Sequence, residues 1–191
     1  MVVSATVSDL SKDIPQEIQD ALKPLVFNPE TGESYIPVVV SKSPSLKIIV
    51  TPPRPSDALT KASIMNGKPV YMNLASAPYP HTVERAGKWL ELRKEECDQE
   101  LSQCLTRLKN LFEAETTEGL GNAVLPGCPV RSIRKIHPDG SDEYLGDISI
   151  KRATFHHIQD PLEAQRMMAE NEARMVGDPE IVWAFASGST K

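Results

Sequence analysis

The sequence predicts an α+β (α/β) domain in which a mostly antiparallel sheet packs against helices. Short runs of β-branched and aliphatic residues, bounded by Pro, Gly, Asn or Asp, recur along the chain. Residues 82–115 contain no proline and have helical periodicity. The 191 residues, 40% hydrophobic and 25% charged, are enough for one globular domain with an extension. We therefore divide the chain into an N-terminal extension (1–45), a domain (46–186) and a short tail (187–191).

The extension is predicted to hold a short helix and a small hairpin. Over residues 14–22, apolar side chains recur at helical spacing. The hairpin would pair residues 25–27 with residues 35–40 around an Asn-Pro-Glu-Thr-Gly-Glu turn. The domain then begins with a strand over residues 46–51, which two prolines close, and a helix over residues 55–66.

A long helix is predicted from residue 82 to about residue 115, after an extended, proline-rich loop at 78–81. Thr82 can cap its start, and Gly119 follows its end. The stretch makes one helix, or two helices joined near Glu95. Its second half is expected to pack on the sheet, with a coiled-coil seam as the alternative.

An antiparallel hairpin is predicted over residues 130–136 and 144–150, around a Pro-Asp-Gly turn, with a bulge at Gly146. The basic residues of its first strand, at positions 131–135, alternate with apolar ones, which predicts that they lie on the solvent face. A helix over 161–176 and a final strand over 180–186 follow.

The charge balance disfavours several classes of partner. A net charge of −5 without a clustered basic patch predicts no nucleic-acid binding, and no apolar run approaches the length of a membrane helix. Three cysteines, and no secretory segment after Met1, predict free buried thiols in a reducing compartment, the cytoplasm or alternatively the nucleus. His156 and His157 are adjacent and cannot share one face of a strand, so we expect no metal site.

The spacing of candidate catalytic residues does not by itself indicate a reaction. The Gly-x-Gly at 119–121 follows a helix, whereas a dinucleotide fingerprint follows a strand. No serine lies in a nucleophile elbow, which disfavours hydrolase chemistry. The catalytic residue is therefore left unassigned.

Three segments in a fixed order carry a family resemblance. They are Thr-Pro-Pro-Arg-Pro-Ser-Asp (51–57), Asn-Gly-Lys-Pro-Val-Tyr-Met-Asn-Leu (66–74) and Pro-Tyr-Pro-His-Thr (78–82). Their order and spacing resemble the start of GNAT-superfamily N-acetyltransferases, in particular fungal relatives of the ribosomal-protein-alanine acetyltransferase group. With the hairpin and the final strand, the similarity extends over about residues 46–186.

The resemblance implies an acyltransferase fold and its ligands. It implies the N-terminal half of a GNAT-like fold, with acetyl-CoA as cofactor and a primary amine as acceptor. The family's fourth strand offers backbone groups to the pantetheine arm of the cofactor, which implies cofactor-binding positions at Trp183, Ala184, Phe185 and Ala186. The loop between the family's first two helices contacts the acceptor, which implies substrate-binding positions at Tyr79 and Pro80.

The residues after the final strand depart from the family pattern. A Gly-rich turn that binds the cofactor pyrophosphate at a helix N-terminus follows the family's fourth strand, and residues 187–191 stand in that place here. The expectation is a fold incomplete at its C-terminal edge, with doubtful acetyl-CoA binding and impaired or absent activity. The alternative is a non-catalytic interaction or regulatory module, which would bind a protein partner or self-associate at the open strand edge.

Overall fold

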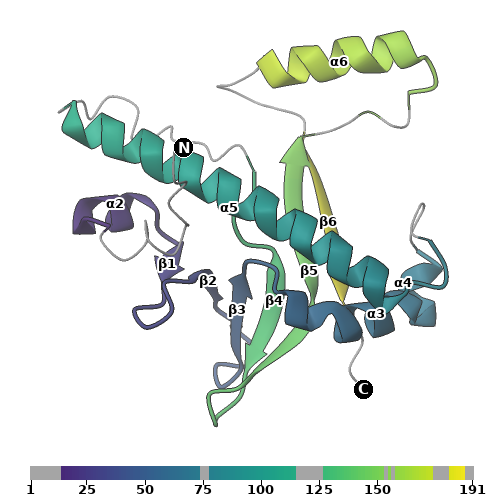
Figure 1. Ribbon diagram of the computed structural model, residues 1–191, viewed down its shortest axis with the longest axis horizontal. Helices are drawn as coiled ribbons and strands as arrows, with labels where there is room; N and C mark the ends of the chain where they lie inside the picture. The colour runs from purple at the N-terminus through teal and green to yellow at the C-terminus, as the bar shows by residue number, and fades with distance from the viewer. Residues whose placement is uncertain are drawn as a thin grey trace, which may run out of the picture.

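The computed structural model describes residues 14–73, 78–114, 127–152, 155, 158–173 and 181–187; for 150–152, 172–173 and 181–187 it describes the backbone alone. Six strands pair in chain order, each antiparallel to the next. The long helix α5 crosses the sheet, and α6 lies beyond one end of β5 (Figure 1). The predicted α+β fold with a mostly antiparallel sheet is confirmed.

The extension adds its hairpin to the main sheet. It comprises α2 (Gln16–Ala21), β1 (Val26–Phe27) and β2 (Ser34–Val38). The side chain of Asn28 shapes the turn between the strands, because its Oδ1 accepts hydrogen bonds from two backbone N–H groups of that turn. β2 then pairs with β3 (Lys47–Thr51) over three residues.

Between β3 and the long helix lie three short helical segments. Pro55 opens the 3₁₀ turn η1 (Pro55–Asp57), which runs directly into α3 (Ala58–Asn66). The helix α4 (Lys68–Tyr71) was not among the predicted elements. The predicted helix over residues 55–66 is thus confirmed as η1 and α3.

The helix α5 (Val83–Glu113) is a single helix, capped as predicted by Thr82, whose Oγ1 accepts a hydrogen bond from the Arg85 N–H. Its second half does not pack on the sheet alone. It shares a buried cluster with α2, to which β1–β3 add partly buried side chains. The fully buried members are Ile18, Leu22, Leu25, Leu101, Cys104, Leu105, Leu108 and Val130. Gly119, the predicted stop, lies outside the described residues.

The predicted C-terminal hairpin is confirmed as β4 (Ser132–Ile136) and β5 (Asp142–Arg152), with a shift of register next to Gly146. Two further elements follow, α6 (Pro161–Ala173) and β6 (Ile181–Ser187), and β6 pairs with β5 along its whole length. Among the described residues, no helix is long and apolar enough to cross a membrane.

Candidate functional site

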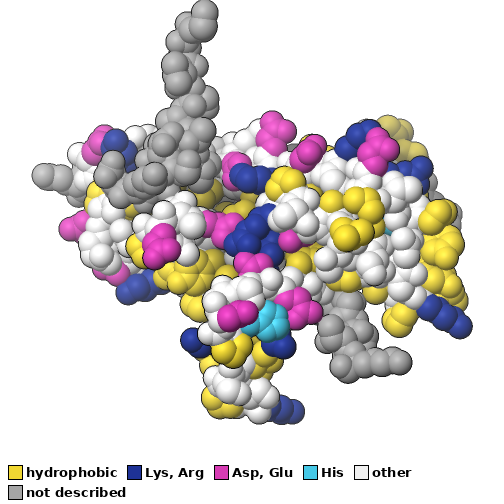
Figure 2. Space-filling model, turned by 60° about the horizontal axis from the view of Figure 1, so that its bottom comes forward, with side chains coloured by type: hydrophobic (Ala, Val, Ile, Leu, Met, Phe, Trp, Pro, Cys, Tyr) yellow, Lys and Arg dark blue, Asp and Glu magenta, His cyan; other side chains and the backbone are white. Residues whose placement is uncertain are grey.

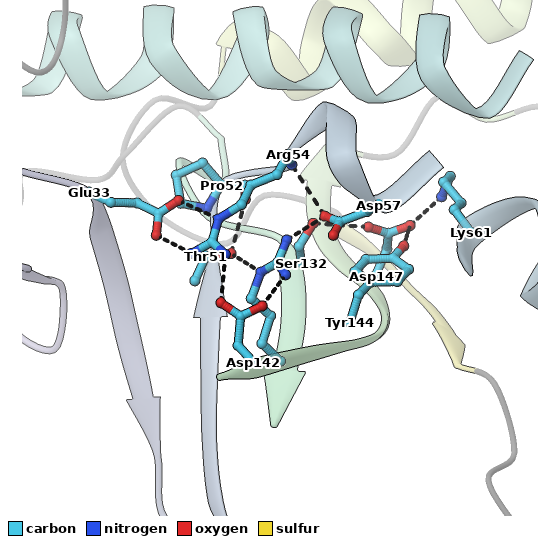
Figure 3. Close-up of polar contacts among 11 residues, drawn as sticks. Glu33, Thr51, Pro52, Arg54, Asp57, Lys61, Ser132, Asp142, Tyr144 and Asp147 are labelled. Carbon is cyan, nitrogen blue, oxygen red and sulfur yellow. Dashed lines mark hydrogen bonds and ion pairs between the residues drawn. The ribbon is translucent and has the colours of Figure 1, made fainter. Parts of the chain in front are cut away.

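A row of charged side chains lies on the sheet beneath η1 and α3, extending from Glu33 to Lys61 (Figure 3). At its centre, Arg134 of β4 is only 2% exposed. Its guanidinium donates to Thr51 Oγ1 at 2.9 Å, to Asp142 Oδ1 at 2.7 Å and to the Asp57 carboxylate. Arg134 therefore ties η1 to three strands of the sheet.

Arg54, which precedes η1, extends the row to the N-terminal hairpin. Its Nε and Nη2 donate to the two Glu33 carboxylate oxygens at 2.8 and 2.5 Å, and its Nη1 donates to Asp142 Oδ2 at 2.6 Å. Such two-point pairs fix geometry as well as charge. Figure 2 shows basic side chains next to acidic ones near the middle of the face that it displays.

Asp147 of β5 forms the other end of the row. Its carboxylate accepts hydrogen bonds from Tyr144 Oη at 2.7 Å, from Ser132 Oγ at 3.4 Å and from the buried Lys61 ammonium of α3. The Lys61 Nζ also lies 3.6 Å from the ring centroid of Trp89 on α5, within cation–π range. Lys61 thus links α3 to both β5 and α5.

Burial sets the protonation preferences of these groups. It raises the pKa of Asp57, although Arg134 opposes that shift, and it lowers the pKa of Lys61, although Asp147 opposes that one. Burial also raises the pKa of Tyr144, so its hydroxyl stays protonated and donates to Asp147. The Lys61 ammonium is 4% exposed and already paired with Asp147, so it is not available to a substrate.

This buried network corrects one sequence interpretation. Arg134 was predicted on the solvent face of its strand, but Arg134 and Ser132 both point under η1 and α3 and are fully buried. The basic residues do not share one face, because Arg134 lies at a buried position whereas Arg131 and Lys135 lie at partly exposed positions. One signal in the sequence could have indicated the buried polar face. Thr51, in the neighbouring strand, is polar, and it lies directly opposite Ser132 in the sheet. All three cations are paired with carboxylates, so the network offers no anion site.

The predicted cofactor-binding residues lie within β6, between its second residue and its last. Trp183, Ala184, Phe185 and Ala186 pair through their backbone with Ile150, Ser149, Ile148 and Asp147 of β5. Ala186 is therefore directly opposite the residue that binds Lys61. In the described part of the chain, no strand pairs with the other edge of β6.

The predicted substrate-binding residues lie in the loop before α5. Tyr79 is 65% exposed, with its ring centroid 4.7 Å from that of Tyr71, and Pro80 is also exposed. Just after them, both backbone groups of His81 hydrogen-bond the Asn66 side chain at the end of α3. The loop is thus attached to α3 through Asn66, and β5, the strand that pairs with β6, is attached to α3 through Lys61.

The cysteines and the histidines were also the subject of predictions. Cys97 and Cys104 are buried free thiols, as expected, and the Cys97 thiol donates to the Cys128 carbonyl at 3.2 Å. In the described ranges, His, Cys, Asp and Glu side chains form no group of three suited to a metal ion. His156 and His157 lie outside those ranges.

Comparison of the chain with protein-family models, with curated proteins and with solved structures finds no match. The GNAT resemblance and the roles assigned through it therefore stay predictions.

Proposed function

We propose that this chain is a GNAT-like domain, homologous to enzymes that transfer an acetyl group from acetyl-CoA to a primary amine. The observation that supports this proposal is the order and pairing of the elements. A strand (β3), two helical segments (α3 and α5), an antiparallel hairpin (β4–β5) and a further antiparallel strand (β6) follow one another, as the resemblance implied.

The backbone of β6 fits the role assigned to it. β5 occupies one edge of the strand, and in the described part of the chain the other edge has no paired strand. Peptide groups on a free edge can hydrogen-bond an extended chain of amides, and the pantetheine arm of acetyl-CoA contains two amides. When bound, acetyl-CoA would supply the thioester that the amine attacks.

The acceptor amine is proposed to bind beside Tyr79 and Pro80. Their loop is anchored to α3 by Asn66, and α3 is anchored to β5 by Lys61, opposite Ala186. One short helix therefore fixes the acceptor segment relative to the cofactor strand. Orientation of this kind is how a protein accelerates attack by a bound amine.

Calorimetry with acetyl-CoA and with free pantetheine tests this proposal. The sequence left acetyl-CoA binding doubtful because the family's pyrophosphate-binding turn is replaced. The proposed contact does not use that turn but the pantetheine arm, so we expect both molecules to bind saturably and with similar affinity. Absence of saturable binding by either one would contradict the proposal. Transfer of the acetyl group is checked on the same sample, by incubation with acetyl-CoA and a peptide with a free N-terminal amine.

A second candidate function rests on the same free edge. A partner strand, or β6 of a second copy, could pair there and extend the sheet, as in other cases of strand addition. Light scattering during gel filtration distinguishes the two functions. A concentration-dependent dimer that pantetheine does not dissociate would favour an interaction module.

We also propose a reducing location, the cytoplasm or the nucleus. Its support is that Cys97 and Cys104 are buried free thiols. Microscopy of the fluorescently tagged chain in its own cells checks this, and secretion of the tagged chain would contradict it.

A further inference from the structure

A cavity lies between the β1–β2 turn and the long helix, away from β6. Its volume is about 470 Å³, in the range of small-molecule sites. The hairpin, the segment after β3, the middle of α5 and Pro129 line it. This inference does not rest on the proposed function.

The apolar part of the lining is buried. Pro52, Leu101 and Pro129 contribute to it, and each is shielded from solvent. Beside them, Ser34 is 2% exposed, and its Oγ has no hydrogen-bond partner. A buried hydroxyl without a partner is unfavourable, because it has lost water and gained nothing in exchange. A ligand oxygen or nitrogen would remove that cost once the Ser34 side chain rotates toward the cavity.

The charged part of the lining is balanced. Arg54 and Glu33 form the rigid pair described above, whereas Lys94 and Asp98 form a half-buried pair one helical turn apart at 2.5 Å. Ion pairs four residues apart on a helix contribute little to stability, so their exchange for ligand contacts costs little. A ligand with only a negative charge would be repelled by the carboxylates of Glu33 and Asp98. A ligand with only a positive charge would be repelled by Arg54 and Lys94.

We infer that this cavity binds a small zwitterion with an apolar side chain, of the class of the free α-amino acids. The ligand's carboxylate would bind Lys94 and the Ser34 hydroxyl, and its ammonium group would bind Asp98. The apolar side chain would lie against Leu101 and the two prolines. Both charges and the apolar group are needed for this fit.

Calorimetry with leucine as the probe tests the inference. We expect saturable binding of leucine, and binding at least about tenfold weaker by leucinamide, which lacks the carboxylate, and by 4-methylpentanoate, which lacks the amine. Equal binding of all three compounds, or no saturable binding of leucine, would overturn the inference.

Two variants and a matched control locate the site. Lys94→Met should weaken leucine binding at least about tenfold. Lys88→Met removes an exposed pair of the same spacing, with Glu84, nearly three turns earlier on α5 and should leave binding unchanged. Ser34→Ala should weaken binding severalfold without lowering the melting temperature of the unliganded protein. Equal losses in Lys94→Met and Lys88→Met, with both variants folded by circular dichroism, would contradict this location.

Discussion

Replacement of Arg134 by Met would test the structural role of the buried network. Met keeps the apolar stem but removes the guanidinium that donates to Thr51, Asp142 and Asp57. Two carboxylates would then lose a cation that is almost fully buried. Removal of one partner from a buried ion pair costs about 3–5 kcal/mol. In a protein of this size each kcal/mol lowers the melting temperature by about 2–4 °C, so we expect a drop on the order of 10 °C.

Urea unfolding followed by circular dichroism measures the loss in free energy of unfolding, and a thermal melt measures the drop in melting temperature. Lys88→Met is the control, because it breaks an exposed pair on α5 and should change the free energy of unfolding by no more than about 0.5 kcal/mol. If Arg134→Met cost less than about 1 kcal/mol, or no more than the control, the network would not be what holds η1 on the sheet.

Three further predictions concern pH, glycine and thiol reactivity. Burial opposes ionisation of Asp142, but the hydrogen bonds and charges of two arginines outweigh it and lower its pKa. A lowered pKa stabilises the fold above the unfolded-state pKa, and this stability is lost as the pH falls through the folded-state value. The melting temperature should therefore fall between about pH 5 and pH 3, and fall less in Asp142→Asn; an equal fall in both would contradict this. Gly140 has φ of 85°, a conformation that an alanine adopts only at a cost, so Gly140→Ala should destabilise the fold by about 1–2 kcal/mol in thermal melts. Gly87 lies inside α5, where alanine is favoured, so Gly87→Ala should stabilise the fold by about 0.5–1 kcal/mol. Changes of the same sign would be inconsistent with these backbone conformations. Burial raises the pKa of the Cys97 thiol to about 12, so iodoacetamide at neutral pH should label it only after unfolding, as mass spectrometry would show. Rapid labelling of the native protein would refute its burial.

Local sequence patterns predicted most elements of the fold. The Pro-Asp-Gly turn defined the β4–β5 hairpin, and Thr82 marked the first turn of α5. These signals lie within a few residues of the structure they specify, so one sequence is enough to interpret them. The short helix α4 was missed because it is one turn long, which is too short for any periodicity.

The charged row could not be predicted from local patterns. Arg134 and Asp57 are 77 residues apart, and Lys61 and Asp147 are 86 apart. Alternation along a strand states that two faces differ, but not which face the helices cover. The cavity beside Ser34 depends likewise on how the hairpin and α5 pack together. The positions assigned through the resemblance, at Tyr79 and in β6, required knowledge of a family.

Chemical-shift mapping of the isotope-labelled chain with pantetheine tests the central proposal most directly. It reports which backbone amides change their surroundings when the ligand is added. The account predicts saturable shifts for the amides of Trp183 to Ala186, with smaller ones along the paired residues of β5. Shifts confined to other elements, or none at saturating pantetheine, would contradict the proposal that β6 is a cofactor-binding strand.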